Sequence, residues 1–251
     1  SGYVVTFDDI TDLISAQRTS AWADVARRIA HEIKNPLTPI QLSAERLRRR
    51  YLPQITDDPE TFEKCTETII RQVNEIGHMV NEFSSYARMP LPVKKAENIV
   101  TVCRDALVLQ REAHPDIDIA FKATSQNVAI DCDRAQITQV LTNLLQNAID
   151  SIHERQTLET EHKGRISIDC LPQGNGVLIE VADNGTGLPE KVKDQLLEPY
   201  VTTKKKGSGL GLAIVKKIME DHGGSIAIED IISEGVKSGV KAAILLPGGR
   251  A

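Results

Sequence analysis

One short stretch of the chain combines an imidazole, a carboxylate and an amide. His31 is followed directly by Glu32, and Asn35 comes four residues after His31, in the run His-Glu-Ile-Lys-Asn-Pro-Leu-Thr-Pro. Residues four apart on a helix share a face, so the His31 and Asn35 side chains should point the same way. A neutral imidazole can act as a nucleophile. The stretch is a candidate reactive site, with an ordinary surface histidine as the alternative.

The residues around His31 indicate a helix with one apolar side. Large apolar residues recur every three or four positions, which predicts a single buried stripe, made of Val25, Ile29, Ile33, Leu37 and Ile40. At about 100° per residue, His31 lies roughly 200° from this stripe and should face solvent. Pro36 and Pro39 cannot donate to the carbonyls four residues earlier, so we expect the helix to bend or loosen just after His31.

A second set of residues could bind a phosphorylated ligand. Asn143 and Asn147 lie four apart in an otherwise apolar segment, and buried amides need partners that a metal-bound triphosphate would supply. Asp183 follows an apolar strand and precedes Gly185 and Gly187, which permit positive φ and close ligand approach. The same Asp-x-Gly-x-Gly pattern also occurs in plain turns.

A glycine-rich turn beside three lysines completes this set. Lys204 to Lys206 precede Gly207-Ser-Gly-Leu-Gly211, which opens a predicted helix. Exposed N–H groups and the helix dipole at such a position attract phosphate. The turn lacks the spacing of a Walker P-loop and the context of a Rossmann fingerprint.

The elements that must position these residues fall into two groups. Helical periodicity runs from residue 13 to about 51 and, after a break at 52–59, resumes with near-heptad apolar residues at 62, 69, 73, 76, 80, 83 and 87. Two such helices bury one face each, so we expect them to pair with a second copy as a four-helix bundle in an obligate homodimer. Met89-Pro-Leu-Pro92 marks a linker.

Beyond the linker the pattern becomes mixed α/β. We expect helices over 99–111, 133–153 and 210–222, and strands over 117–122, 128–130, 165–169, 177–182, 225–229 and 240–246. A short strand over 3–7 and a turn over 8–12 precede the first helix, and they resemble the exit from a PAS sensor domain or form a strand of only local use.

Composition excludes several classes of protein. The chain has 251 residues and a net charge of −5, which does not suggest a nucleic-acid partner. No apolar run reaches the ~18 residues of a membrane helix, and no secretion signal is visible. The four cysteines are scattered, as in a reduced cytoplasmic protein without a zinc or disulfide framework.

Taken together, the motifs resemble those of the sensor histidine kinases of two-component systems. The His31 stretch resembles their H-box, Asn143-Leu-Leu-Gln-Asn147 their N-box, Asp183-Asn-Gly-Thr-Gly187 their G1 box, Glu198-Pro-Tyr-Val-Thr-Thr-Lys204 their F-box and Gly207 to Gly211 their G2 box. Tyr200 stands where many members carry phenylalanine, and we expect an aromatic residue to pack there equally well. The stretch from about 188 to 208 would form a mobile lid.

The resemblance implies roles for individual residues. His31 would accept the γ-phosphoryl group of ATP, Glu32 would hold the imidazole proton, and Asn35 would assist dephosphorylation. Asn147 would coordinate Mg²⁺ and Asp183 would accept the adenine amino group. ATP would be bound by Asn143, Asn147, Asp183, Gly185, Gly187, Tyr200, Thr203, Lys204, Gly207, Gly209, Leu210 and Gly211.

The implied architecture is α+β with several domains. The tail of a PAS-like domain would occupy 1–15, a dimerisation and phosphotransfer hairpin 16–92, and a Bergerat-fold α/β-sandwich ATP-binding domain 93–251. The H-box and F-box are most similar to those of NtrY-type nitrogen-regulation sensor kinases. This implies autophosphorylation of His31, transfer to an aspartate of an NtrX-type response regulator, and a cytoplasmic core below a membrane-anchored sensor.

Two alternatives come from other classes. The chain could act mainly as a response-regulator phosphatase or docking scaffold, with weak kinase activity. It could instead be a Bergerat-fold ATPase, such as gyrase or the Hsp90 chaperones. Those ATPases carry a water-activating glutamate where this chain has Asn143, which favours phosphoryl transfer to protein.

Overall fold

The structure is a computed structural model that describes residues 11–87, 89–204, 207–233 and 235–248, without the side chains of 11–24, 78, 191 and 194. The chain divides into two compact units, Ser1–Pro90 with Lys206–Ser208, and Leu91–Lys205 with Gly209–Ala251. The expected strand over 3–7 lies outside the described residues. Of the expected turn over 8–12, the part from Thr11 onward is helical.

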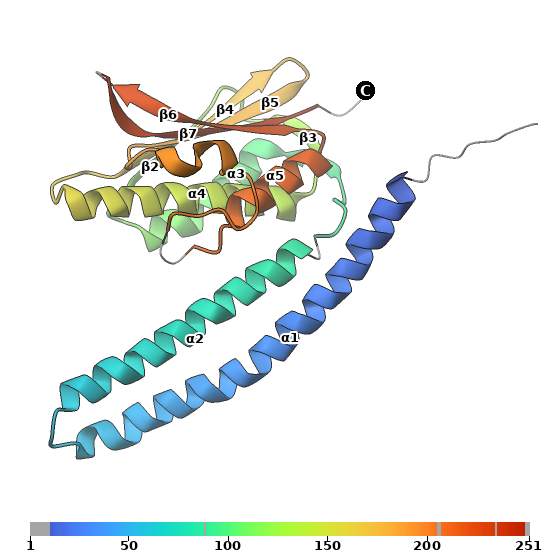
Figure 1. Ribbon diagram of the computed structural model, residues 1–251. Helices are drawn as coiled ribbons and strands as arrows, with labels where there is room; N and C mark the ends of the chain where they lie inside the picture. Colours follow the sequence, from blue (N-terminus) through green and yellow to red (C-terminus); the bar gives the residue numbers. More distant parts are fainter. Residues whose placement is uncertain (1–10, 88, 205–206, 234, 249–251) are drawn as a thin grey trace, which may run out of the picture. The chain divides into compact units, whose positions relative to one another are not determined.

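The first unit is an antiparallel helical hairpin. Helix α1 (Thr11–Tyr51) is followed by the 3₁₀ turn η1 (Leu52–Gln54) and helix α2 (Pro59–Ala87). Helix α1 continues through Pro36 and Pro39, and its ribbon is bowed (Figure 1). Asp58 adopts a positive φ of 53° and accepts a hydrogen bond from the Thr61 N–H at 3.2 Å, which starts α2 with proline in its first turn.

Small residues line the α1 side of the hairpin interface, and the predicted apolar stripe does not. Ala26, Ala30 and Ala44 are buried, whereas four members of the stripe are exposed, between Ile33 at 38% and Val25 at 48%. The prediction that this stripe is buried is wrong within one chain. A hairpin buries only one narrow strip of each helix, and the alanine strip occupies it, so the larger side chains project away from α2.

The second unit contains a five-stranded sheet covered on one face by three helices (Figure 1). Its strand order is β2-β4-β5-β7-β6, with β2 parallel to β4 and the other pairs antiparallel, and β1 and β3 form a separate pair. The strands are β1 (Lys95–Asn98), β2 (Asp118–Ala123), β3 (Ala129–Cys132), β4 (Arg165–Gln173), β5 (Gly176–Asp183), β6 (Ser225–Ser233) and β7 (Val236–Leu246). The helices are α3 (Ile99–Ala113), α4 (Arg134–Leu158) and α5 (Gly211–Asp221), with the 3₁₀ segment η2 (Glu190–Gln195).

Alternation along the strands creates the core of this unit. Every second residue is buried along β5 and over the first six residues of β4. The register pairs Ile168 with Val181, so the apolar residues share the face toward the helices. Helix α4 is capped by Asp133, whose side chain accepts from Ala135 N–H at 3.0 Å and Gln136 N–H at 3.2 Å. Strand β5 ends at Asp183, which places this carboxylate at the rim of the core.

The architecture confirms a helical region followed by an α/β domain. Several details differ from the sequence prediction. Strand β1 and η2 were not expected, α4 runs to Leu158 instead of residue 153, and β4, β6 and β7 are each about four residues longer than predicted. Strand β1 is short and polar, and its existence depends on pairing with β3, which a local pattern does not show. Within the described part of the chain, no helix has both the length and the apolar content to cross a membrane.

Candidate functional site

His31 lies on α1 of the hairpin, with its side chain exposed to solvent. Asn35, one turn later, is also exposed. Glu32 does not pair with His31: its Oε1 accepts from Arg28 Nε at 2.9 Å, between two well-exposed side chains. We expect release from Arg28 to free Glu32 for its predicted role toward the imidazole.

The predicted nucleotide residues of the second unit gather around α4. Asn147 Oδ1 and Asp150 Oδ2 each lie 2.7 Å from Lys204 Nζ, so two oxygens from one helix face converge on a single cation. Hard oxygen ligands of this kind suit Mg²⁺. The sequence assigned Asn147 and Lys204 to the site but did not assign Asp150.

Asn143 connects α4 to the glycine-rich turn. Its Nδ2 donates to the Gly211 carbonyl at 3.2 Å, at the first residue of α5. Leu210, immediately before, is buried and its carbonyl accepts from Ile214 N–H at 2.8 Å. The side chain at Asn143 thus fixes the start of α5, the helix end that was predicted to face phosphate.

Asp183 is buried at the end of β5, with 8% of its surface exposed. Its Oδ1 accepts from Gly185 N–H at 2.8 Å and from Val240 N–H at 3.3 Å. Burial raises the pKa of this carboxyl to about 6, against the lowering effects of those two N–H groups and of the Lys204 charge. At neutral pH the carboxyl is mostly ionised and can accept a hydrogen bond from an amino group.

Residues that the sequence did not indicate hold the turn after Asp183. A Cβ on Gly185 would lie 2.2 Å from Ser151 Oγ, so only glycine allows the turn to rest on α4. Thr186 N–H donates to Ser151 Oγ at 3.1 Å, and Arg155 donates to the Gly185 carbonyl at 3.3 Å. Ser151 and Arg155 lie one turn apart in α4, so their spacing could have indicated that they share a helix face. It could not have indicated that the turn after Asp183 packs against that face.

Gly239 of β7 is a further residue to which the sequence gave no weight. Its φ is +152°, and a Cβ there would lie 1.8 Å from the Asp183 carbonyl oxygen. This close approach brings the Val240 N–H to the Asp183 carboxylate. Only the antiparallel pairing of β5 with β7 reveals it.

A buried carboxylate on β6 anchors the segment that follows Gly187. Gly187 has a φ of +85°, and the next residue, Leu188, donates its N–H to Asp230 Oδ1 at 2.7 Å. Lys237 donates to the Leu188 carbonyl at 2.8 Å, and Lys193 lies 3.0 Å from Asp230 Oδ2. Lys237 Nζ also lies 3.2 Å from Asp230 Oδ2. Burial opposes ionisation of Asp230, but its hydrogen bonds with the Leu188 N–H, Lys193 and Lys237 outweigh burial and lower the pKa of the carboxyl.

The other end of the predicted lid is closed by backbone contacts. Tyr200 has a φ of +67°, and its N–H donates to the Gly209 carbonyl at 3.0 Å. A Cβ on Gly209 would lie 2.6 Å from the Tyr200 carbonyl carbon, so glycine is required there. The Tyr200 side chain is 60% exposed, so the expectation that it packs is wrong in this chain.

Two other predicted residues remain outside this network. Thr203 is exposed. Gly207 belongs to the short segment that divides with the first unit, so its place beside the nucleotide residues is not described.

Comparison with family models divides the chain in a similar way. Residues 21–91 match the His Kinase A (phospho-acceptor) domain. Residues 132–249 match the histidine kinase-, DNA gyrase B- and HSP90-like ATPase family.

The chain is also similar to curated proteins of the NtrY type. The chain is 54% identical to nitrogen regulation protein NtrY of Azorhizobium caulinodans over 91% of this chain and 29% of that protein. It is 39% identical to a putative sensor histidine kinase, NtrY-like, of Rickettsia conorii over 92% of this chain and 37% of that protein. The chain therefore spans about a third of the length of these relatives.

Solved structures agree with the fold. The histidine kinase ThkA, solved in complex with the response regulator protein TrrA, matches 97% of this chain and 69% of its own at 30% identity and a TM-score of 0.64. The catalytic domain of ThkA matches 62% of this chain and 95% of its own at 34% identity and a TM-score of 0.52. The structure has an exposed histidine on a helical hairpin and the predicted nucleotide residues on an α/β domain. Together with these matches, this leads to one conclusion: the chain belongs to the sensor histidine kinases and is similar to NtrY.

Proposed function

We propose that this chain is a kinase core that transfers the γ-phosphoryl group of ATP to His31 and then to an aspartate of a response regulator. The observation that carries the proposal is the presence, in one chain, of an exposed histidine in an H-box motif and an ATPase-type domain. In that domain Asp183 accepts from the Gly185 N–H and Asn147 accepts from Lys204. The phosphotransfer hairpin is assigned to 16–92, the ATP-binding domain to 93–251, and the tail of a PAS-like domain to 1–15.

The residues around Asn147 fit a magnesium ion. Asn147 Oδ1 and Asp150 Oδ2 converge on Lys204 Nζ, and this convergence of two oxygens on one positive charge supports the assignment. A bound Mg²⁺ would neutralise charge on the ATP phosphates. Lys204 would then be released from Asn147 and Asp150, free to bind phosphate oxygen.

The other roles in ATP binding and phosphoryl transfer belong to residues of the chain itself. The Asp183 carboxylate accepts the adenine amino hydrogen, and Gly185 and Gly187 allow the ring to approach the backbone. The N–H groups at the start of α5, held by Asn143, bind phosphate. His31 attacks with its neutral imidazole, and Glu32, once released from Arg28, accepts the proton of the ring.

The exposed stripe on α1 supports a homodimer. Ile29 and Ile33 leave more than a third of their surface in water, and so do Ile69 and Ile76 on α2. Apolar surface arranged along two helices of one hairpin is the surface that a four-helix bundle buries. We assign the partner as a second copy of this chain.

The similarity to NtrY extends the proposal to the physiological role. We assign the chain to nitrogen regulation, with an NtrX-like receiver domain as the partner and a membrane-anchored sensor upstream of a cytoplasmic core. Phosphotransfer tests this: phosphorylated chain should lose its label to a purified NtrX-type receiver within seconds to minutes. A receiver whose acceptor aspartate is replaced by asparagine should receive none.

Asn35 supports a second activity at the same histidine. Its amide is exposed one helical turn from His31, where it can orient water against a phosphorylated receiver. If the chain is mainly a phosphatase, label will disappear from a phosphorylated receiver faster with the chain than without it, and Asn35→Ala will abolish this effect. An ATPase would instead release phosphate steadily, even with His31 replaced.

A further inference from the structure

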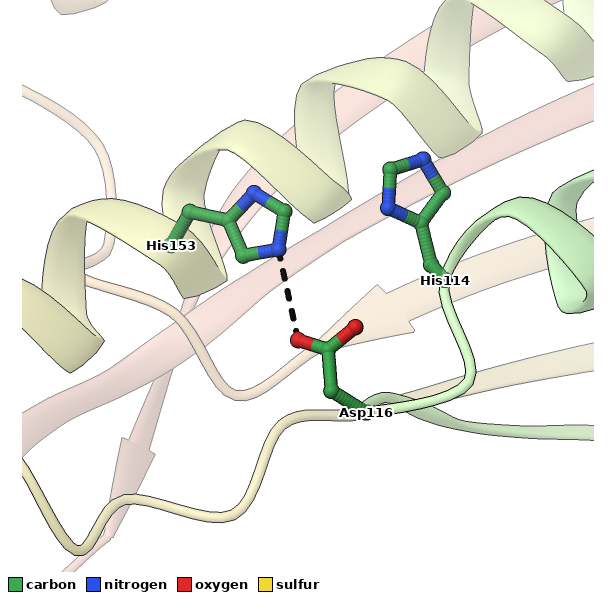
Figure 2. Close-up of side chains that lie close together, drawn as sticks. All are labelled: His114, Asp116 and His153. Atoms are coloured by element: carbon green, nitrogen blue, oxygen red, sulfur yellow. Dashed lines mark ion pairs between the residues drawn. The ribbon is translucent and has the colours of Figure 1, made fainter.

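Three side chains with metal-binding chemistry meet on the ATP-binding domain, and none belongs to the proposed nucleotide site. His114 follows α3, Asp116 lies in the turn before β2, and His153 lies near the end of α4 (Figure 2). One ligand atom of each lies within 4.8 Å of the other two. Figure 2 shows the two rings and the carboxylate turned toward a common space.

The turn that carries His114 and Asp116 has a fixed backbone. The His114 N–H donates to the Gln110 carbonyl at 3.0 Å, and the His114 carbonyl accepts from the Ile117 N–H at 3.2 Å. These bonds close the end of α3 and a tight turn on either side of Asp116. The two potential ligands are therefore presented together before any ion binds.

The same turn is packed closely beside α4. A Cβ on Gly164 would lie 2.5 Å from Ile152 Cγ2 and 3.1 Å from Ile117 Cγ1, so both side chains press on this glycine. The Asp118 N–H also donates to the Gly164 carbonyl at 3.0 Å. Since His153 follows Ile152 directly, the packing sets the distance between the turn and the third ligand.

The distances suit a small transition-metal ion. His153 Nε2 lies 3.5 Å from Asp116 Oδ2, and two ligands with tetrahedral bonds of about 2.0–2.1 Å lie about 3.4 Å apart. The His114 and His153 ring centroids are 5.6 Å apart with the planes tilted by 53°, so the rings are not stacked. The ligand atom of His114 lies within 4.8 Å of the other two, so an ion would have to draw this ring closer by about an ångström.

We propose that His114, Asp116 and His153 bind a divalent transition-metal ion of the zinc type, with water completing the coordination. Two imidazoles and one carboxylate favour such an ion over Mg²⁺ or Ca²⁺, which prefer oxygen ligands alone. The bound ion joins the α3–β2 turn to α4, the helix that carries Asn143 and Asn147. Binding should therefore raise the unfolding temperature of the ATP-binding domain.

Calorimetric titration of Zn²⁺ into the full chain, without nucleotide, tests the site. His114→Ala and His153→Ala should each weaken zinc binding by about tenfold or more. Asp118→Asn is the matched control: this residue lies two positions beyond Asp116, and its exposed carboxylate lies 3.8 Å from Arg165 Nε. It should bind zinc like the wild type, and zinc should raise the unfolding temperature of both.

Two results would overturn the proposal. One is a wild-type chain that shows no zinc binding; the other is binding that survives both histidine variants, as zinc at the exposed Cys65 would. A second readout does not depend on the variants folding. In the wild type, added Zn²⁺ should shift the imidazole NMR signals of His114 and His153 and leave that of the buried His222 unchanged.

Discussion

Ile33 of the helical hairpin keeps 38% of its surface in water, whereas Ile149 of the ATP-binding domain is fully buried. The same contrast holds for the reactive groups. His31 is exposed and Glu32 pairs with a surface arginine, while Asp183 is buried and held by two backbone N–H groups. The predicted site of the domain is built from the domain's own residues. The hairpin presents its histidine on a helix that also leaves large apolar side chains in water.

The largest effect is expected when charges are placed on the exposed apolar stripe of α1. Ile29→Glu combined with Ile33→Glu should abolish the homodimer, because each isoleucine contributes about 1.5–3 kcal/mol when buried and each appears twice. Light scattering with size-exclusion chromatography measures the mass. Leu109→Glu, at an exposed position on α3, is the control and should stay dimeric. A double variant that remains a dimer would contradict the assignment of this stripe to the interface.

A smaller effect is expected where the domain is tightly packed. Gly185→Ala should lower the free energy of unfolding of the ATP-binding domain by about 2–3 kcal/mol, because the new Cβ meets Ser151. Urea denaturation followed by circular dichroism measures it. Gly77→Ala in α2 has no atom within 4 Å of the added Cβ and should be neutral or stabilising. If both variants lost the same free energy of unfolding, the two units would not differ in packing around these glycines.

The ionised Asp183 carboxylate should lower the free energy of unfolding of the ATP-binding domain, although it serves ATP binding. Burial raises the Asp183 pKa from 3.8 to about 6, so the folded state binds the carboxyl proton more tightly than the unfolded state does. The protonated carboxyl therefore stabilises the fold at low pH, and this stabilisation is lost as pH rises through about 4 to 6. Asp183→Asn keeps an oxygen for Gly185 N–H and removes the charge. Near pH 7 it should therefore gain up to roughly 3 kcal/mol of unfolding free energy.

The same variant should bind ATP poorly, and wild-type ATP affinity should fall as pH drops below about 6. Denaturation and nucleotide titration at several pH values check both effects. A variant that loses stability equally at acid and neutral pH would show that the ionised carboxylate carries no such cost.

The smallest effect concerns the hairpin's surface pair. Arg28→Ala should change the free energy of unfolding by less than about 0.5 kcal/mol, because both side chains are exposed. It releases Glu32, so His31 should be phosphorylated at the same rate or faster. A clear loss of rate would instead assign Arg28 a direct role in the reaction.

The sequence predicted most of the fold because both units have strong periodicity. The helices of the hairpin and the long strands β4, β5 and β7 have clear apolar patterns, and their positions agree with the structure to within a few residues. Strand β1 was missed because a short polar strand depends on its partner β3. The stripe on α1 was misjudged because periodicity shows that a face is apolar but not whether its partner lies in the same chain.

The proposed nucleotide residues were predicted from motifs, whereas the residues that hold them in position were not predicted. Asn147, Lys204 and Asp183 stand out by type and spacing, and the structure shows what holds each of them. Asp230 and Lys237 anchor the segment after Gly187 from strands more than forty residues away. No local pattern reports such contacts, because they arise only when the sheet has formed.

Labelled-ATP incorporation with Mg²⁺ tests the central claim most directly. The wild type should acquire acid-labile, base-stable label, and His31→Gln should acquire none while still binding nucleotide. Asn147→Ala should lose label because it loses the metal-bound nucleotide, with the hairpin unaffected. Label that survives His31→Gln would contradict the account of this chain as a kinase that phosphorylates its own histidine.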